Sequence, residues 1–176
     1  AREEERPCAQ LCLLSGQLLL RCNADPAAIA QIIDPELEDN DRFEMLEVGV
    51  EVARRAGDAA TLHARLRRAA RAAAEPAKSA AAWREAAAVA ESGLNDNAMA
   101  IEDLRELLDA DETDAAGWDK LGALLSATED FSALADLFER RIDVTTEPAP
   151  QRELRYRLAN LLVEKLDRPE DAVNIY

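Results

Sequence analysis

The chain's one histidine, His63, is the residue that a Ser–His or Cys–His pair would need for nucleophilic catalysis. It lies in the segment Thr61-Leu62-His63-Ala64-Arg65, and Arg67, Arg68 and Arg71 follow closely. This setting is typical of a solvated basic helix. The sequence also contains no glycine-rich phosphate loop, no HExxH zinc motif and no GxSxG nucleophile motif. We therefore predict no catalytic residue and do not expect an enzyme.

The three cysteines, Cys8, Cys12 and Cys22, all lie near the start of the chain. Cys8 and Cys12 are four residues apart on one helix face, where the geometry for a disulfide is poor. A metal site would need a fourth ligand, and His63 is the only histidine available. We predict reduced, packed cysteines in a cytoplasmic protein, with an intermolecular disulfide or a metal site as the alternatives.

Carboxylates gather in two runs, at 36–41 and at 109–114. The second run resembles a calcium loop only superficially, because it lacks the spaced glycine and the distal glutamate of such loops. We expect Thr113 or Asp114 to cap the helix that follows and the rest to form a solvated turn, with a cation site as the alternative. We predict no metal and no cofactor.

A basic stretch extends over 54–71, where Asp58 is the only opposing charge. The simpler interpretation is a solvated face whose arginines pair with acidic neighbours. The alternative is a patch that recognises an anionic segment of a partner protein. That patch would consist of Arg65, Arg67, Arg68 and Arg71.

The elements that carry these residues are predicted to be helices throughout. Ala (36) and Leu (24) far outnumber Val (7) and Ile (6), which favours helix over strand. Apolar residues recur at steps of three and four, as in Phe131, Leu134, Leu137, Phe138 and Ile142. Breakers such as 56–58, 75–76 and 128–130 end each stripe, so the pattern predicts an array of short helical hairpins.

The hairpins also repeat. Trp118-x2-Leu121-Gly122-x2-Leu125 resembles the first helix of a tetratricopeptide repeat, and positions 13, 46, 83, 118 and 156 recur near that family's 34-residue period. The resemblance implies an all-α fold, an α-solenoid of stacked antiparallel helix pairs in a right-handed superhelix. It implies a degenerate hairpin or cap at 1–40 and repeats at about 41–77, 78–114, 115–149 and 150–176, the last one truncated.

In this family, small residues let the two helices of a pair approach, and large anchors fill the space between neighbouring helices. The resemblance gives the first role to Gly122, Ala87 and Val50. It gives the anchor role to Trp83, Trp118 and Tyr156. Asn160 and Arg141 depart from the pattern, which indicates either looser packing or positions that face a partner.

The first helices of such arrays line a concave surface that binds peptides. Carried over by position, this surface would consist of Glu47, Glu51, Arg84, Glu85, Ala88, Asp119, Lys120, Ala123, Arg157, Leu158 and Leu161. The alternative is that these residues form only the solvated inner face of the array. The asparagines of the family's carboxylate clamp are missing, so a chaperone-tail ligand is not expected.

These features predict a non-catalytic scaffold that binds a peptide or partner protein. The alternative is a self-associating module that pairs through Leu11–Leu20 or through the end near Tyr176. A net charge of −15 argues against nucleic acid, and no apolar run is long enough for membrane insertion. The composition suggests a bacterial source. The absence of an initial Met suggests a fragment of a longer cytoplasmic chain.

Overall fold

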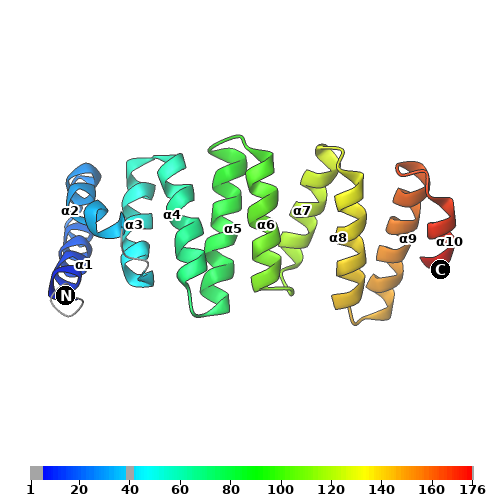
Figure 1. Ribbon diagram of the computed structural model, residues 1–176, viewed down its shortest axis with the longest axis horizontal. Coiled ribbons are helices and arrows are strands. Elements are labelled where there is room, and N and C mark those ends of the chain that lie inside the picture. The colour runs from blue at the N-terminus through cyan, green and yellow to red at the C-terminus, as the bar shows by residue number, and fades with distance from the viewer. Residues whose placement is uncertain (1–5, 39–41, 176) are drawn as a thin grey trace. The chain divides into compact units, whose positions relative to one another are not determined.

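The computed structural model describes the backbone of residues 6–38 and 42–175 and the side chains of residues 9–38 and 42–175. These residues form ten α-helices and no strand (Figure 1). The helices are α1 (Arg6–Arg21), α2 (Pro26–Glu38), α3 (Phe43–Ala56), α4 (Ala59–Ala72), α5 (Pro76–Ser92), α6 (Asn97–Ala110), α7 (Ala115–Ala127), α8 (Phe131–Val144), α9 (Pro148–Glu164) and α10 (Pro169–Ile175). None of them has the length and apolarity that crossing a bilayer would require.

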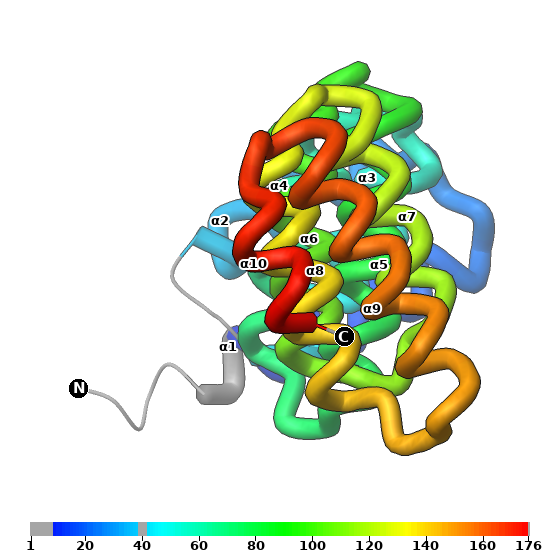
Figure 2. Tube along the Cα trace, turned by 90° about the vertical axis from the view of Figure 1, so that its right-hand side faces the viewer, coloured from blue at the N-terminus to red at the C-terminus, as the bar shows by residue number. Residues whose placement is uncertain are grey.

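The chain divides into two compact units, Ala1–Asp111 and Glu112–Tyr176. Unit 1 contains α1 to α6, and unit 2 contains α7 to α10. Within each unit, consecutive helices are antiparallel and pack against one another. In unit 1, α3 and α5 lie on one side and α4 and α6 on the other (Figure 2). The predicted all-α stack of antiparallel helix pairs is therefore confirmed within each unit.

Aspartates precede five of the described helices, and Asp25 before α2 accepts a hydrogen bond from the Ala27 N–H over 3.4 Å. The side chains of Asp58, Asp96, Asp114 and Asp130 accept hydrogen bonds from backbone N–H groups of the first turn. Each bond satisfies a donor that has no partner inside the helix. Asp114 is thus the cap that the sequence placed in the second acidic run. Gly57 ends α3 with a φ of 71°, a left-handed conformation that favours glycine.

Apolar stripes of neighbouring helices form the core of each unit. The two tryptophans are both buried, each with 3% of its surface exposed, and both therefore act as the predicted anchors. Tyr156 does not, because 54% of it is exposed. The buried stripe of α9 contains Leu154 and Leu158. Tyr156 lies two residues from each, about 200° around a helix that turns 100° per residue.

Close helix approach depends on glycines other than the one that the repeat pattern indicated. A Cβ added at Gly16 would lie 3.0 Å from Val48 Cγ1 and 3.1 Å from Ile33 Cγ2. At Gly122 the nearest side-chain atoms would be 3.7 Å away, an ordinary contact. Gly122 therefore has room for a Cβ, which would be in ordinary contact with α8, and this position is compatible with the predicted small residue. The tightest position is Gly49 on α3, where a Cβ would lie 2.7 Å from Leu37 Cδ1.

Candidate protein-binding site

A hollow of about 290 Å³ opens between α3, α4 and α5 in unit 1. Its apolar lining consists of Phe43, Val50, Leu66, Ala69, Ala81 and Ala82. The three alanines leave the space that larger side chains would fill. This volume is at the lower end of ligand pockets, and it suits a side chain of a partner better than a cofactor.

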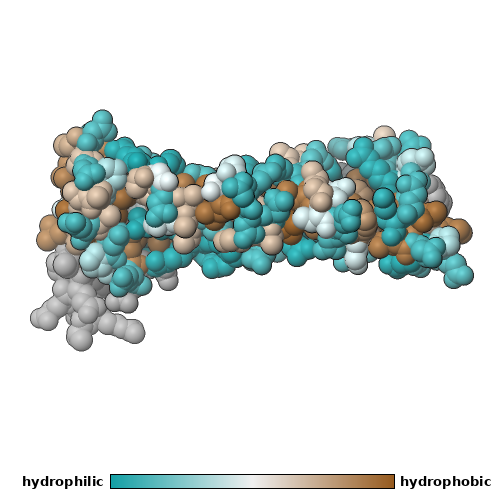
Figure 3. Space-filling model, turned by 90° about the horizontal axis from the view of Figure 1, so that it is seen from above, coloured by the Kyte–Doolittle hydropathy of each residue, from teal (hydrophilic) through white to brown (hydrophobic). Residues whose placement is uncertain are grey.

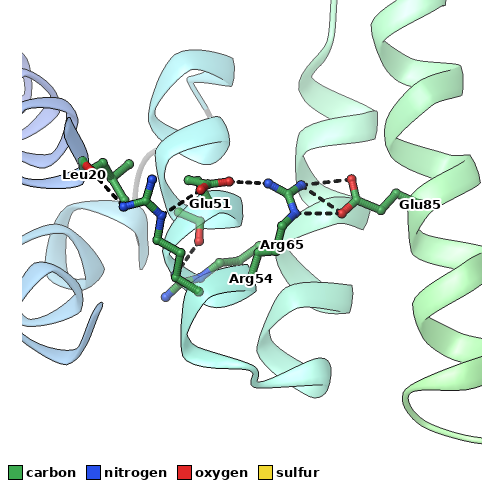
Figure 4. A network of polar contacts seen from close by, with 7 residues as sticks. Leu20, Glu51, Arg54, Arg65 and Glu85 are labelled. Atoms are coloured by element: carbon green, nitrogen blue, oxygen red, sulfur yellow. Dashed lines mark hydrogen bonds and ion pairs between the residues drawn. The ribbon is translucent and has the colours of Figure 1, made fainter. Parts of the chain in front are cut away.

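Charged side chains surround this apolar floor, and one arginine connects two of the helices. Arg54 Nη2 on α3 donates to Glu85 Oε1 on α5 over 2.8 Å, and Arg54 also pairs with Glu51 (Figure 4). Arg55 Nε donates to the other oxygen of Glu51 over 2.8 Å, and Arg55 Nη1 donates to the Leu20 carbonyl over 2.8 Å. The network therefore joins α1, α3 and α5 along one side of unit 1.

The network favours the charged forms of Glu51 and Arg54. Partial burial alone would raise the pKa of Glu51, but the hydrogen bonds and charges of Arg55 and Arg54 outweigh it and lower that pKa. Desolvation alone would lower the pKa of Arg54, but Glu85 and Glu51 outweigh it and raise the pKa. At neutral pH this side of the hollow therefore carries fixed charges of both signs.

The other side of the hollow is more acidic. Lys78 Nζ lies 5.4 Å from the centre of the Phe43 ring and donates to Glu75 Oε1 over 2.9 Å. The hydrogen bond to Glu75 is the largest influence on the pKa of Lys78 and raises it, and Glu47 and Glu44 act in the same direction. Five glutamates thus lie in or beside the hollow, and the cations that line it are Arg54 and Lys78.

Of the predicted groove residues in unit 1, three line this hollow: Glu47, Glu51 and Glu85. Arg84 and Ala88 are exposed on α5 but do not line it. The apolar lining was missed because Phe43, Ala69, Ala81 and Ala82 read as ordinary helix residues in the sequence.

In unit 2, the predicted residues Asp119, Lys120, Ala123 and Arg157 are exposed on α7 and α9. The sequence analysis placed Leu158 and Leu161 on the groove surface, but their exposed fractions are only 1% and 9%. Both belong to the buried stripe of α9, so little of either side chain is exposed to a partner. Arg141, a departure from the repeat pattern, donates to Asp119 Oδ1 over 2.6 Å.

The four arginines of the possible basic patch have partners within unit 1. Arg65 donates to the Gly49 carbonyl over 2.8 Å and to Asp34 Oδ1 over 2.5 Å. Arg68 donates to the Leu37 carbonyl over 2.7 Å. Arg71 stacks over the Trp83 ring, with its guanidinium carbon 5.5 Å from the ring centre. Arg67 pairs with acids of α6. These contacts favour the interpretation of a paired face over an open anion-binding patch.

His63 is the main correction to the sequence analysis. It is 2% exposed, and its Nε2 lies 2.6 Å from Oδ2 of the fully buried Asp103 on α6. Arg67 Nε lies 3.3 Å from Asp103 Oδ1 in an ion pair. Burial raises the pKa of Asp103, and the hydrogen bond and charge of His63 oppose that rise. The spacing of residues in the sequence could have indicated that His63 is buried, because it lies on the same buried stripe of α4 as Leu66 and Ala70.

The cysteines and the possible metal ligands are the remaining candidates for chemistry. Cys12 and Cys22 are both reduced thiols, and the side chain of Cys8 lies outside the described residues. Among the described residues, no three His, Cys, Asp or Glu side chains are placed to hold a metal ion.

Comparison with known proteins identifies the fold. No protein-family model matches the chain, and no curated protein matches it. Among solved structures the chain is similar to MamA protein, with a TM-score of 0.52 and 15% identity over 96% of this chain and 87% of that chain. It is also similar to the MamA RS-1 ArsTM double mutant, with a TM-score of 0.50 and 16% identity over 96% and 90%. At these identities the similarity supports a common helical-repeat fold.

Proposed function

We propose that the chain is a non-catalytic scaffold that binds a segment of a partner protein in the hollow between α3, α4 and α5. One observation carries the proposal: an apolar floor with space for a side chain lies beside a row of glutamates. Protein-binding surfaces combine an apolar centre with a polar rim in this way.

The lining indicates the chemistry of the bound segment. An apolar side chain would fill the space above Ala81 and Ala82 and remove apolar surface from water. A lysine or arginine next to it would face Glu47, beside which Glu44 and Glu75 add negative charge. Arg54 is already held by Glu51 and Glu85, so an acidic segment would gain less there. We therefore propose a segment with an apolar residue beside a basic one.

We also propose that the chain is a divergent tetratricopeptide-repeat protein. The buried anchors Trp83 and Trp118, in the first helices of two hairpins, support this proposal, as does the helical-repeat fold. The exposed Tyr156 is where the chain departs from the family's packing.

Selection from a library of random displayed peptides tests the binding site. We expect the selected peptides to share an apolar residue next to Lys or Arg. Ala82→Phe would fill the hollow and should weaken their binding at least about tenfold, the equivalent of about 1.4 kcal/mol. Ala64→Phe, on an exposed position of α4, is the matched control and should bind normally.

Charge reversal separates the rim from the floor. Glu47→Lys should weaken binding, and this loss should shrink as salt is added. Glu106→Lys makes the same change at an exposed position of α6 and should have no effect. Peptides that bind Ala82→Phe and Glu47→Lys as well as they bind the unaltered chain would show that the hollow is not the binding site.

A further inference from the structure

The first helix turns a row of leucines outward. Leu11, Leu14 and Leu18 on α1 are 64%, 47% and 60% exposed, while Ala9 and Leu13 on the inner side are buried. The spacing of three and four residues places the exposed leucines in one stripe along α1. In repeat stacks, a helix face that no neighbour covers is usually polar, whereas this face of α1 is apolar.

The same face is free of charge. No charged residue occurs between Pro7 and Leu20, although 32% of the chain is charged. On α2, which packs against α1, Ile32 is 42% exposed, and the other exposed positions before Glu38 are Ala27, Ala28, Gln31 and Pro35. The Asp34 side chain of α2 is 44% exposed and is paired with Arg65 of α4. Apolar surface gathers at the end of unit 1 that α1 and α2 form (Figure 3).

A second copy of the chain fits this face better than another partner does. Each copy has a net charge of −15, so two copies repel one another wherever charged surfaces meet. The uncharged leucine stripe of α1 avoids that cost. It also offers no attraction to a strongly charged partner. The stripe is also self-complementary, because two antiparallel copies place Leu11 against the partner's Leu18 and bring the two Leu14 side chains together.

We infer that this chain forms a dimer in which the α1 stripes of two copies pack antiparallel about a two-fold axis near Leu14. With α1 and α2 about 20 Å long and about 10 Å apart, each copy contributes on the order of 400 Å². The total of about 800 Å² lies below that of stable complexes, so the dimer dissociates on dilution. The interface lies on α1 and α2 and is independent of the peptide-binding hollow.

Light scattering on the full chain over about 5 to 500 μM tests the dimer. The molar mass should rise from 19.3 kDa towards twice that value with concentration. Added salt should strengthen the association, because it screens the repulsion between the copies. Leu14→Glu should remain monomeric with unchanged helical content, whereas Val173→Glu, at a 75% exposed position of α10, should dimerise normally.

A mixing experiment tests the two-fold axis. Leu14→Glu and Leu14→Lys place like charges together in a homodimer, so each should be monomeric by itself. An equal mixture should recover the mass of a dimer, because Glu then faces Lys. An unaltered chain that stays monomeric throughout would overturn the inference and leave the face to another protein or segment. A dimer that Leu14→Glu leaves intact, or a mixture that stays monomeric, would overturn it too.

Discussion

The buried pair of His63 and Asp103 allows the sharpest test of how unit 1 is held together. The pair joins α4 to α6 through contacts at 2.6 Å, and the two side chains are 3% and 0% exposed. His63→Leu would leave the Asp103 carboxylate with Arg67 as its remaining charged partner. Asp103→Val would leave the imidazole without its hydrogen-bond partner.

The expected magnitudes follow from burial. An unsatisfied buried polar group costs about 1–3 kcal/mol, and breaking a buried ion pair costs about 3–5 kcal/mol. Because Arg67 compensates part of the charge, we expect about 2–3 kcal/mol for each single change. The double variant leaves neither group unpartnered and should lose about as much as one single variant. The coupling energy is then about 2 kcal/mol.

Urea unfolding followed by tryptophan fluorescence measures these differences. In a Trp118→Phe background, Trp83 is the only tryptophan and reports on unit 1 alone. With a urea dependence of about 1–2 kcal/mol/M, each single change of about 2–3 kcal/mol should lower the midpoint by about 1–3 M. The reasoning is refuted if the two single losses add up in the double variant, because the pair would then carry no coupling.

Three further predictions concern the same unit or its neighbour. Burial raises the pKa of Asp103 above its ordinary value of 3.8. The contribution of the protonated carboxyl to stability is therefore complete below pH 3.8, and it is lost as the pH rises through the raised pKa. Urea midpoints of the unaltered chain and of Asp103→Asn, measured over a pH series, test this. The difference between the two midpoints should decrease as the pH rises. Gly16→Ala should destabilise unit 1 by about 1 kcal/mol, because stiff β-branched neighbours cannot yield, whereas Gly122→Ala should stabilise unit 2 by about 0.5–1 kcal/mol. Gly57→Ala should cost about 1 kcal/mol, measured by thermal unfolding, because of the left-handed backbone at that position.

The helices themselves could be predicted well from the sequence. Each interruption that the breakers indicated, such as 56–58 or 128–130, falls between two helices or in the first turn of one. Trp83 and Trp118 are buried as expected. These features depend on local spacing and on turn residues, which the sequence contains directly.

The details of the surface could not be predicted in the same way. Leu158 and Leu161 were assigned to a groove by position in a repeat, but the stripe of α9 is turned so that both are buried. His63 read as solvated because its neighbours are arginines, yet its partner Asp103 is 40 residues away in the chain. The hollow depends on small side chains from three helices, and no local pattern reports a space that is left empty.

Helix α5 has a consequence for how this chain can vary. Its buried positions include Ala80, Ala86, Ala87 and Ala90, all with 5% or less of their surface exposed. In a buried stripe of leucines, like that of α9, a leucine can be replaced by methionine or isoleucine at a modest cost in stability. A buried alanine can be replaced only by glycine, which weakens the helix, or by a larger residue, which pushes the neighbouring helices apart. We therefore expect natural variants to be nearly fixed at the buried alanines of this one helix.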